Sequence, residues 1–358
     1  MQIANRSSIT KEEELQVRRM LINYFEPSLS GTELENCMIW RLTGGMNNST
    51  YLIHLKGKRY VLRMYNSHQD KDKVKYEHAI LNSLTIHKQA FVYPQLVQTL
   101  ENTTFTHHEG KIGALFHYQE GSNAVRMGPS QYLQLGQKAG QVTLALSRIT
   151  VPLAPVYPPY YRLDLAYPEI SQAKFIRFLQ QPDSSFLTLR QETKEIAEVI
   201  EELFIKTRGG LEDLPHQLVH GDLNASNILV NEEGDITTIL DFEFATWDLR
   251  VMELAVPLSD LITGMILNEN YTAKAEEKMW NNLNALISGY TSEVTLLPEE
   301  KDMIPSLVLL RRVDVVMHFL TRYHKGIDPA DIVSDQLQKL ISCVRWLALH
   351  QARVRQLL

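Results

Sequence analysis

The chain has 358 residues, of which 44% are hydrophobic and 22% charged, enough to build one large or two smaller cores. Its formal net charge is −6, and Lys and Arg are scattered among acidic residues, which argues against a nucleic-acid partner. No run of about 18 uncharged apolar residues predicts a membrane span, and the first residues lack the apolar core of a signal peptide. We therefore expect a cytoplasmic protein without a nucleic-acid or membrane partner; the oligomeric state stays unknown.

The first third of the chain combines β-type runs with two helical segments. Thr10 and Glu13 form a capping-box pattern that opens the first helix, through about residue 25. The remaining elements expected here are strands at 38–42, 50–55, 59–64, 95–101 and 112–118, and a helix at 71–88. Together they predict an N-terminal lobe, residues 1–115, with an antiparallel sheet of five strands.

The rest of the chain has mostly helical periodicity. Apolar residues recur three or four positions apart from about residue 130, with one β-rich interruption at 216–241. Residues 151–165, rich in proline and tyrosine, predict an ordered surface loop or lid. We expect a hinge at 116–121 and a mostly helical lobe at 122–358, so the fold class is α+β.

The segment around residues 220–243 carries the strongest chemical signal. Apolar runs at 228–230 and 236–240 flank a polar turn and predict a hairpin, whose open end would bring Asn227 beside Asp241. Asp222 lies five residues before Asn227. Carboxylate and amide oxygens suit Mg²⁺ when nucleotide phosphates supply further ligands. A carboxylate left over from metal binding can accept a proton from an attacking hydroxyl.

Glu77 lies on the apolar stripe of the expected helix at 71–88, together with Val74 and Leu81. Because an unpaired buried charge is costly, we expect a cationic partner, and Arg63 in the apolar strand is the best candidate. A surface-exposed Arg63 with a solvated Glu77 is the alternative.

Between the first two long strands lies a turn that contains Gly44, Gly45, Asn48 and Ser49. Its glycines would let the backbone approach phosphates closely, and Asn48 or Ser49 could donate hydrogen bonds to them. A plain hairpin turn explains the same residues. No Walker-type phosphate loop occurs, so nucleotide binding depends on the wider pattern.

That wider pattern resembles the catalytic and metal loops of the aminoglycoside phosphotransferase and choline kinase family, a branch of the protein-kinase-like fold. The matching residues are His220-Gly221-Asp222, Asn227 and, after the hairpin, Asp241-Phe242-Glu243. The resemblance implies a two-lobed protein-kinase-like fold, with a β-rich N-lobe that binds nucleotide and a mostly helical C-lobe that carries catalysis.

The resemblance also implies roles for single residues. Asp222 would be the catalytic base, and Asn227 and Asp241 would bind Mg²⁺. Arg63, paired with Glu77, would hold the phosphates of ATP; the family pattern has lysine at this position, but arginine offers a fork of donors. The backbone of Tyr118 or its neighbours in the hinge would bind adenine.

The expected function is ATP- and Mg²⁺-dependent transfer of the γ-phosphoryl group to a hydroxyl of a small metabolite. The chain length, Arg63 and the Gly-Gly-x-Asn-Asn turn look closest to homoserine-kinase-type bacterial members, which suggests an amino alcohol such as homoserine as acceptor. The catalytic residues alone do not select the acceptor. The alternative is a kinase-like binding or structural protein with little or no activity. Two further features have no assigned role: the tyrosines at 160–161, which would contact substrate or anchor an aromatic lid in the core, and the arginines at 311–312, which could reach an acidic group of the substrate.

Overall fold

The structure is a computed structural model that describes residues 6–25, 36–42, 48–65, 70–124, 126–209, 211–267 and 272–358. The chain divides into two compact units. Unit 1 consists of Met1–Ala124, Ile149–Ala154 and Ile228–Glu243. Unit 2 consists of Val125–Arg148, Pro155–Asn227 and Phe244–Leu358.

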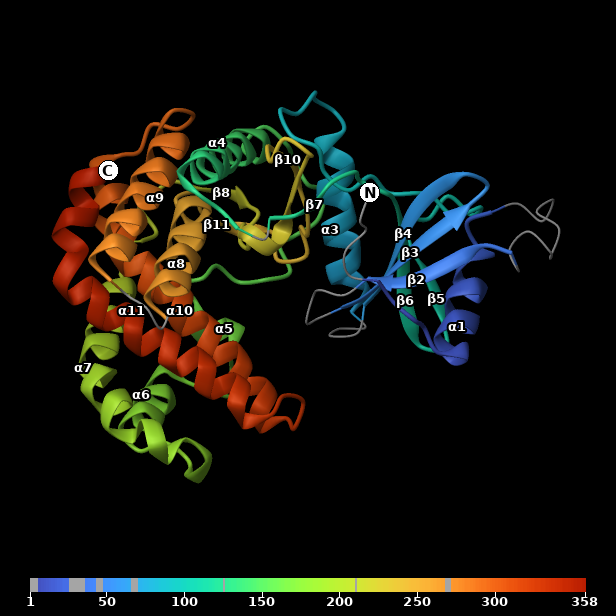
Figure 1. Ribbon diagram of the computed structural model, residues 1–358. Helices are drawn as coiled ribbons and strands as arrows, with labels where there is room; N and C mark the ends of the chain where they lie inside the picture. Colours follow the sequence, from blue (N-terminus) through green and yellow to red (C-terminus); the bar gives the residue numbers. More distant parts are fainter. Residues whose placement is uncertain are drawn as a thin grey trace. The chain divides into compact units, whose positions relative to one another are not determined.

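Unit 1 is built on an antiparallel sheet with the strand order β1-β2-β3-β4-β6-β5 (Figure 1). Its strands are β1 (Arg6–Ser7), β2 (Met38–Leu42), β3 (Asn48–Leu55), β4 (Lys58–Tyr65), β5 (Thr106–His108) and β6 (Lys111–His117). A tight turn joins β3 to β4, with both Lys56 (φ 50°) and Gly57 (φ 74°) in the left-handed region. Two such residues give the turn that matches the twist of paired strands.

Two helices of unit 1 pack on opposite faces of this sheet. Alternation along β4 directs Leu62 and Met64 into the apolar core that contains α1 (Lys11–Leu21). Arg63 and Tyr65, one position out of phase, contact α3 (Lys71–Leu84) instead. The expected capping box at the start of α1 is confirmed.

The α+β fold class is confirmed, but the sheet differs from the expected one at its edges. The strand expected at 95–101 is wrong, since only Leu96 forms an isolated bridge, to Phe116. The edge strand is β5, in the polar stretch between the strands expected at 95–101 and 112–118. Glu109 (φ 48°) and Gly110 (φ 77°) make a tight turn between β5 and β6. This turn favours pairing of the two strands although β5 contains few apolar residues. The two-residue strand β1 was not expected.

The hairpin expected in the catalytic segment is present in unit 1. It consists of β9 (Ile228–Val230) and β10 (Ile236–Ile239), with β7 (Ser122–Asn123) beside β9. Val230 lies opposite Ile236 and Ile228 lies opposite Ile239, so the register shifts by one residue at an irregularity between Ile236 and Thr238.

Unit 2 is mostly helical and contains one small two-stranded sheet, β8 (His216–Val219) paired with β11 (Thr246–Leu249). Its helical elements are α4 (Pro129–Leu146), α5 (Leu163–Ala166), α6 (Gln172–Gln180), η1 (Ser184–Leu189), α7 (Arg190–Thr207), η2 (Ala225–Asn227), α8 (Met252–Ile266), α9 (Ala273–Thr291), α10 (Pro298–His324) and α11 (Ala330–Leu357). Strand β11 comes before α8 and positions Asp248 in the interior of unit 2.

Facing glycines bring α4 and α9 into close contact. A Cβ atom on Gly136 would lie 2.1 Å from the Leu286 carbonyl oxygen, and one on Gly289 would lie 2.1 Å from the Leu133 carbonyl oxygen. Any side chain at either position would therefore force the two helices apart.

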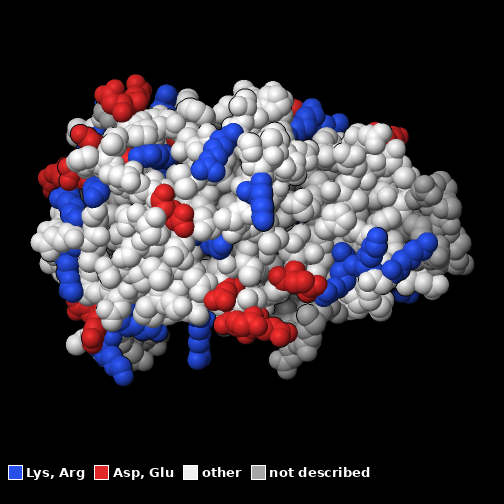
Figure 2. All heavy atoms as spheres, turned by 90° about the horizontal axis from the view of Figure 1, so that it is seen from above, with Lys and Arg blue, Asp and Glu red and all other residues white. Residues whose placement is uncertain are grey.

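None of the helices in the described part of the chain is long and apolar enough to cross a membrane. On the face shown in Figure 2, basic and acidic side chains are interspersed.

Candidate functional site

The predicted ion pair between Arg63 and Glu77 is present in unit 1. Arg63 Nη1 lies 2.8 Å from Glu77 Oε1, while Nη2 donates to Asp241 Oδ1 and lies 3.5 Å from Glu243 Oε2. The side chains of Arg63 and Glu77 are 14% and 3% exposed, so the pair is largely withdrawn from solvent. We call Arg63, Glu77, Asp241, Glu243 and Asn48 the Arg63 cluster.

Helix α3 and strand β4 position this pair. Glu77 lies on the buried face of α3, and the Tyr65 hydroxyl donates to its Oε2 at 2.9 Å. Burial raises the pKa of Glu77 to about 7, although Arg63 acts in the opposite direction. Burial also disfavours a charged Arg63, but its carboxylate neighbours raise its pKa well above the ordinary value. The guanidinium therefore stays charged and fixed.

Asp241 follows β10 with a left-handed backbone, at φ 62°. This conformation is uncommon for residues other than glycine, and Asp and Asn tolerate it best. The Asp241 side chain is 29% exposed, so its carboxylate keeps access to solvent beside Arg63. Strained backbone of this kind is enriched at functional sites.

The residues predicted to contact phosphates from the turn are only partly described. Gly44 and Gly45 lie outside the described residues. Asn48 Nδ2 donates to Glu243 Oε2, and the Asn48 Oδ1 atom is buried without a hydrogen-bond partner among the described residues. Ser49 is buried on β3. A contact of these residues with phosphate stays a prediction.

Tyr118 follows β6 in unit 1, and its backbone is partly engaged. Its N–H donates to the Arg59 carbonyl oxygen at 3.2 Å, and the Arg59 guanidinium lies 4.5 Å from the centre of the Tyr118 ring. Adenine recognition here would thus use the carbonyl of Tyr118 or the backbone of its neighbours, and it stays a prediction.

Unit 2 contains the predicted base and the other predicted metal ligand. Asn227 Nδ2 donates to Asp222 Oδ2 at 3.0 Å and to the Asp222 carbonyl oxygen at 2.8 Å. The second carboxylate oxygen, Asp222 Oδ1, accepts from Arg311 Nη2 at 2.6 Å. The Tyr160 hydroxyl accepts from Arg311 Nη1 at 2.9 Å. We call Asp222, Asn227, Arg311 and Tyr160 the Asp222 cluster.

The loop that carries Asp222 is braced from behind. The buried His220 donates its backbone N–H to Glu253 Oε1, and its ring Nδ1 accepts from the Asp222 N–H at 3.2 Å. Gly221 has φ 77°, and a Cβ there would lie 3.0 Å from the Phe244 carbonyl oxygen. Only glycine adopts this φ without strain and avoids the close contact with Phe244, because it has no Cβ. Glu253 on α8 thus holds the start of this loop.

Two buried carboxyls in the same region have altered acidity. Burial raises the pKa of Glu253 to about 8 and that of Asp248 to about 7, because a charge in a dry interior is disfavoured. Asp248 Oδ2 accepts from the Tyr160 N–H at 2.6 Å, which anchors residues 155–161 to β11.

Sequence reasoning did not assign roles to Tyr160 and Arg311, although both contact the catalytic loop. One signal was available. Asp314 follows Arg311 by three positions, so the two meet on one face of a long helix. The signal did not identify Asp222 as the second partner.

The donor set of the predicted metal ligands suits a hard divalent cation. Because Asp222 fixes the Nδ2 side of the Asn227 amide, the Oδ1 side is oriented as an oxygen ligand. Asp241 adds a partly exposed carboxylate. Among the described residues no group of three or more His, Cys, Asp or Glu forms a closed metal site. Each of the two residues, within its own unit, carries an oxygen of the kind that Mg²⁺ binds; Mg²⁺ usually takes further ligands from water and phosphates. Their use as ligands stays a prediction.

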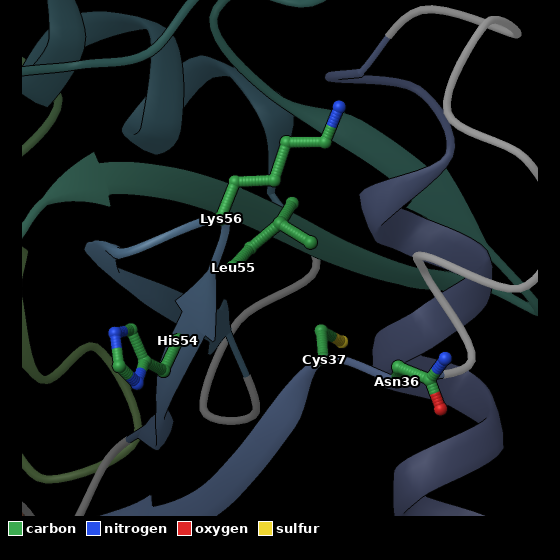
Figure 3. Close-up of a pocket in the computed structure, with 5 residues that line it drawn as sticks. All are labelled: Asn36, Cys37, His54, Leu55 and Lys56. Atoms are coloured by element: carbon green, nitrogen blue, oxygen red, sulfur yellow. The ribbon is translucent and has the colours of Figure 1, made fainter.

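A shallow pocket of about 210 Å³ lies elsewhere in unit 1, at the ends of β2 and β3 (Figure 3). Asn36 and Cys37 line it from the start of β2, and His54, Leu55 and Lys56 from the end of β3. None of the predicted site residues lines it, so it carries no part of the predicted chemistry.

Comparison with known proteins shows the family of the chain. The model of the phosphotransferase enzyme family matches residues 39–284, more than half of the chain. A protein named homoserine kinase, from Chelativorans sp. (strain BNC1), is 24% identical over 307 residues, covering 86% of each chain.

Solved structures with the same fold include the microcompartment-associated aminopropanol kinase, with TM-score 0.67, 14% identity and coverage of 94% of this chain and 97% of that one. The amicoumacin kinase hAmiN has TM-score 0.63, 15% identity and coverage of 94% of both chains. They confirm the protein-kinase-like fold. The predicted resemblance is likewise confirmed: the chain belongs to the phosphotransferase enzyme family.

Proposed function

We propose that this protein transfers the γ-phosphoryl group of ATP to a hydroxyl group of a small metabolite, with Mg²⁺ as the required cation. The observation that carries the proposal is the connection of Arg63 to both Glu77 and Asp241. It joins the predicted phosphate-binding pair to a predicted metal ligand through one buried guanidinium.

In the proposed reaction, the hydroxyl oxygen of the acceptor attacks the γ-phosphorus, and Asp222 accepts the proton of that hydroxyl. The bond between that phosphorus and the β–γ bridging oxygen breaks, and ADP leaves. Arg63 fixes the phosphates, and Glu77 keeps Arg63 aligned. Mg²⁺ bound by Asn227 and Asp241 would neutralise charge on the phosphates. Positioning and charge stabilisation account for most of the catalysis in this class of reaction.

The nucleotide and cation have support from a relative of the same fold. The solved amicoumacin kinase hAmiN is a complex with AMP-PNP and Ca²⁺. A non-hydrolysable ATP analogue and a divalent cation in that protein favour ATP and a divalent cation in this one.

Homoserine is the first acceptor to test, because the relatives that match along most of this chain are named homoserine kinase. Their identity of 24–25% leaves room for a different acceptor. The fold relative named aminopropanol kinase points to another small amino alcohol.

The test measures ADP formation with ATP and Mg²⁺ for homoserine, aminopropanol, ethanolamine, choline, methylthioribose, and representative sugars and aminoglycosides. The Asp222→Asn variant is the matched control, since it retains the shape and one acceptor oxygen but loses the base. Acceptor-dependent ADP formation that Asp222→Asn abolishes would establish the kinase. Binding of ATP and Mg²⁺ without turnover of any acceptor would favour the alternative of a binding protein, and failure to bind ATP would overturn the proposal.

A further inference from the structure

Arg311 contacts the predicted catalytic base from a distant part of the chain, within unit 2. Its Nη2 lies 2.6 Å from Asp222 Oδ1, and the side chains of Arg311 and Asp222 are only 13% and 18% exposed. The catalytic loop, residues 220–227, contains no Lys or Arg of its own. The cation beside Asp222 is therefore supplied by α10, 89 positions later in the sequence.

A second contact ties the same guanidinium to the backbone of the loop. The Tyr160 hydroxyl accepts from Arg311 Nη1 and donates to the Gly221 carbonyl oxygen, so one hydroxyl connects both. The Arg311 guanidinium carbon also lies 5.5 Å from the centre of the Tyr160 ring. Asp222 is thus attached to α10 through its carboxylate, and its preceding residue is attached through Tyr160.

Other contacts hold Arg311 itself in place. Arg311 Nη1 lies 3.1 Å from Asp314 Oδ2, and the Tyr167 hydroxyl donates to Asp314 Oδ1 at 2.7 Å. The Arg311 Nε atom is buried with no hydrogen-bond partner among the described residues. Two hydrogen-bonded acids and a tyrosine thus hold the two terminal nitrogens of the Arg311 guanidinium.

The next residue provides a contrast on the same helix. Arg312 Nε donates to Ser259 Oγ at 2.7 Å, and its Nη2 donates to Asp260 Oδ1 at 2.6 Å. Arg312 is likewise buried and paired with an aspartate, but none of its contacts reaches the catalytic loop. Arg311 thus contacts the catalytic loop, whereas Arg312 contacts α8.

We propose that Arg311 is a positioning residue for phosphoryl transfer: with Tyr160, it fixes the orientation of the Asp222 carboxylate toward the acceptor hydroxyl. The inference depends on the proposed function, since it assumes that Asp222 is the base. Asn227 holds one carboxylate oxygen and Arg311 the other, so the carboxylate cannot rotate without breaking a hydrogen bond. Misplacement of a reacting group by about 1 Å can lower a rate by about 100-fold.

The test compares Arg311→Lys and Arg311→Ala with Arg312→Lys and Arg312→Ala, using an acceptor that the wild-type protein turns over. Arg311→Lys should lower kcat by about 10- to 100-fold with little change in the KM for ATP, because a lysine amine cannot reach both Asp222 and Tyr160. Arg312→Lys should retain most of the kcat. Tyr160→Phe should lower kcat less than Arg311→Ala does.

Guanidinium ion provides a readout that a purely structural role would not change. Added at millimolar concentration, it should restore part of the kcat of Arg311→Ala and none of any loss in Arg312→Ala. A wild-type kcat in Arg311→Ala would overturn the inference. Equal losses in the two alanine variants without rescue would also overturn it.

Amide hydrogen exchange tests the inference independently of activity. The loop at 220–227 should exchange faster in Arg311→Ala than in the wild type or in Arg312→Ala. Unchanged exchange of that loop in Arg311→Ala would refute the positioning role even if no acceptor were found. Absence of any acceptor for the wild type, with faster exchange in the variant, would refute the proposed function and, with it, the catalytic part of the inference, while the hold of Arg311 on the loop would stand.

Discussion

Arg63 on β4 and Glu77 on α3 form a largely buried ion pair, with 2.8 Å between Nη1 and Oε1. The same guanidinium donates to Asp241, so one side chain serves a helix carboxylate and a predicted metal ligand together. A lysine amine is a single point and cannot match this fork. The arginine in place of the family's lysine therefore has a geometric use in this protein.

Arg63→Lys should lower kcat/KM for ATP by about 100-fold, because a lysine cannot contact Glu77 and Asp241 at once. Steady-state kinetics with varied ATP at saturating Mg²⁺ would measure the loss. Arg41→Lys is the control, since Arg41 is an exposed arginine of the same sheet and pairs with Glu13. A wild-type kcat/KM for ATP in Arg63→Lys would contradict the role of the fork.

Asp241→Asn and Asp241→Ala should separate the role of the carboxylate from that of the backbone. Both remove the negative charge of the predicted metal ligand, so Mg²⁺ should strengthen ATP binding less than in the wild type in calorimetric titrations, and Asp241→Ala should lose more of this effect than Asp241→Asn. Alanine, unlike asparagine, is strained in the left-handed region at φ 62°. Asp241→Ala should therefore lower the free energy of unfolding by about 1 kcal/mol more than Asp241→Asn does. Retained Mg²⁺ dependence in both variants would show that Asp241 is not a ligand.

Local sequence patterns predicted the parts of the fold that alternate or repeat regularly. Strands β2, β3 and β4 lie within two residues of their expected bounds, because each is a run of apolar and β-branched or aromatic residues bounded by turn residues. The Arg63–Glu77 pair followed from the same reasoning, since a charge on an apolar stripe needs a partner.

The features that sequence reasoning missed depend on packing between distant segments. Strand β5 is short and polar, and it forms because it pairs with β6 across a tight turn. The contact between Asp222 and Arg311 joins residues 89 positions apart, and no periodicity encodes it. Helix α10 places many side chains at similar depth, so its pattern could not show which of the residues at 311–312 faces the catalytic loop.

The buried carboxyl of Glu253 predicts how stability depends on pH. Its folded-state pKa of about 8 exceeds the ordinary value of 4.5, so the folded protein binds this proton more tightly than the unfolded chain does. Its contribution to stability is therefore complete below about pH 4.5 and declines as pH rises toward 8. Between pH 6 and 8, the free energy of unfolding should fall by roughly 2 kcal/mol from this group. Asp248, with a pKa of about 7, acts in the same direction.

Glu253→Gln should remove part of this decline. Glu253 Oε1 accepts from the His220 N–H, and Oε2 has no partner among the described residues, so glutamine reproduces the protonated acid. Denaturant unfolding at several pH values should show a flatter profile for the variant, with the two proteins most alike near pH 5. Parallel profiles for the two proteins would mean that Glu253 does not titrate in this range.

The contact between α4 and α9 should make Gly136 intolerant of any side chain. A Cβ there would lie 2.1 Å from the Leu286 carbonyl oxygen, which belongs to the backbone of α9 and cannot turn aside. Gly136→Ala should therefore lower the free energy of unfolding by about 2 kcal/mol or more, measured by denaturant titration.

Gly264, on the exposed side of α8, is the matched control, because nothing lies within 4 Å of a Cβ built on it. Gly264→Ala removes backbone freedom from the unfolded chain and should raise the free energy of unfolding by about 0.5–1 kcal/mol. The same substitution is thus expected to have opposite signs at the two glycines. Equal effects would mean that helix propensity, rather than the close approach of α4 and α9, decides stability at Gly136.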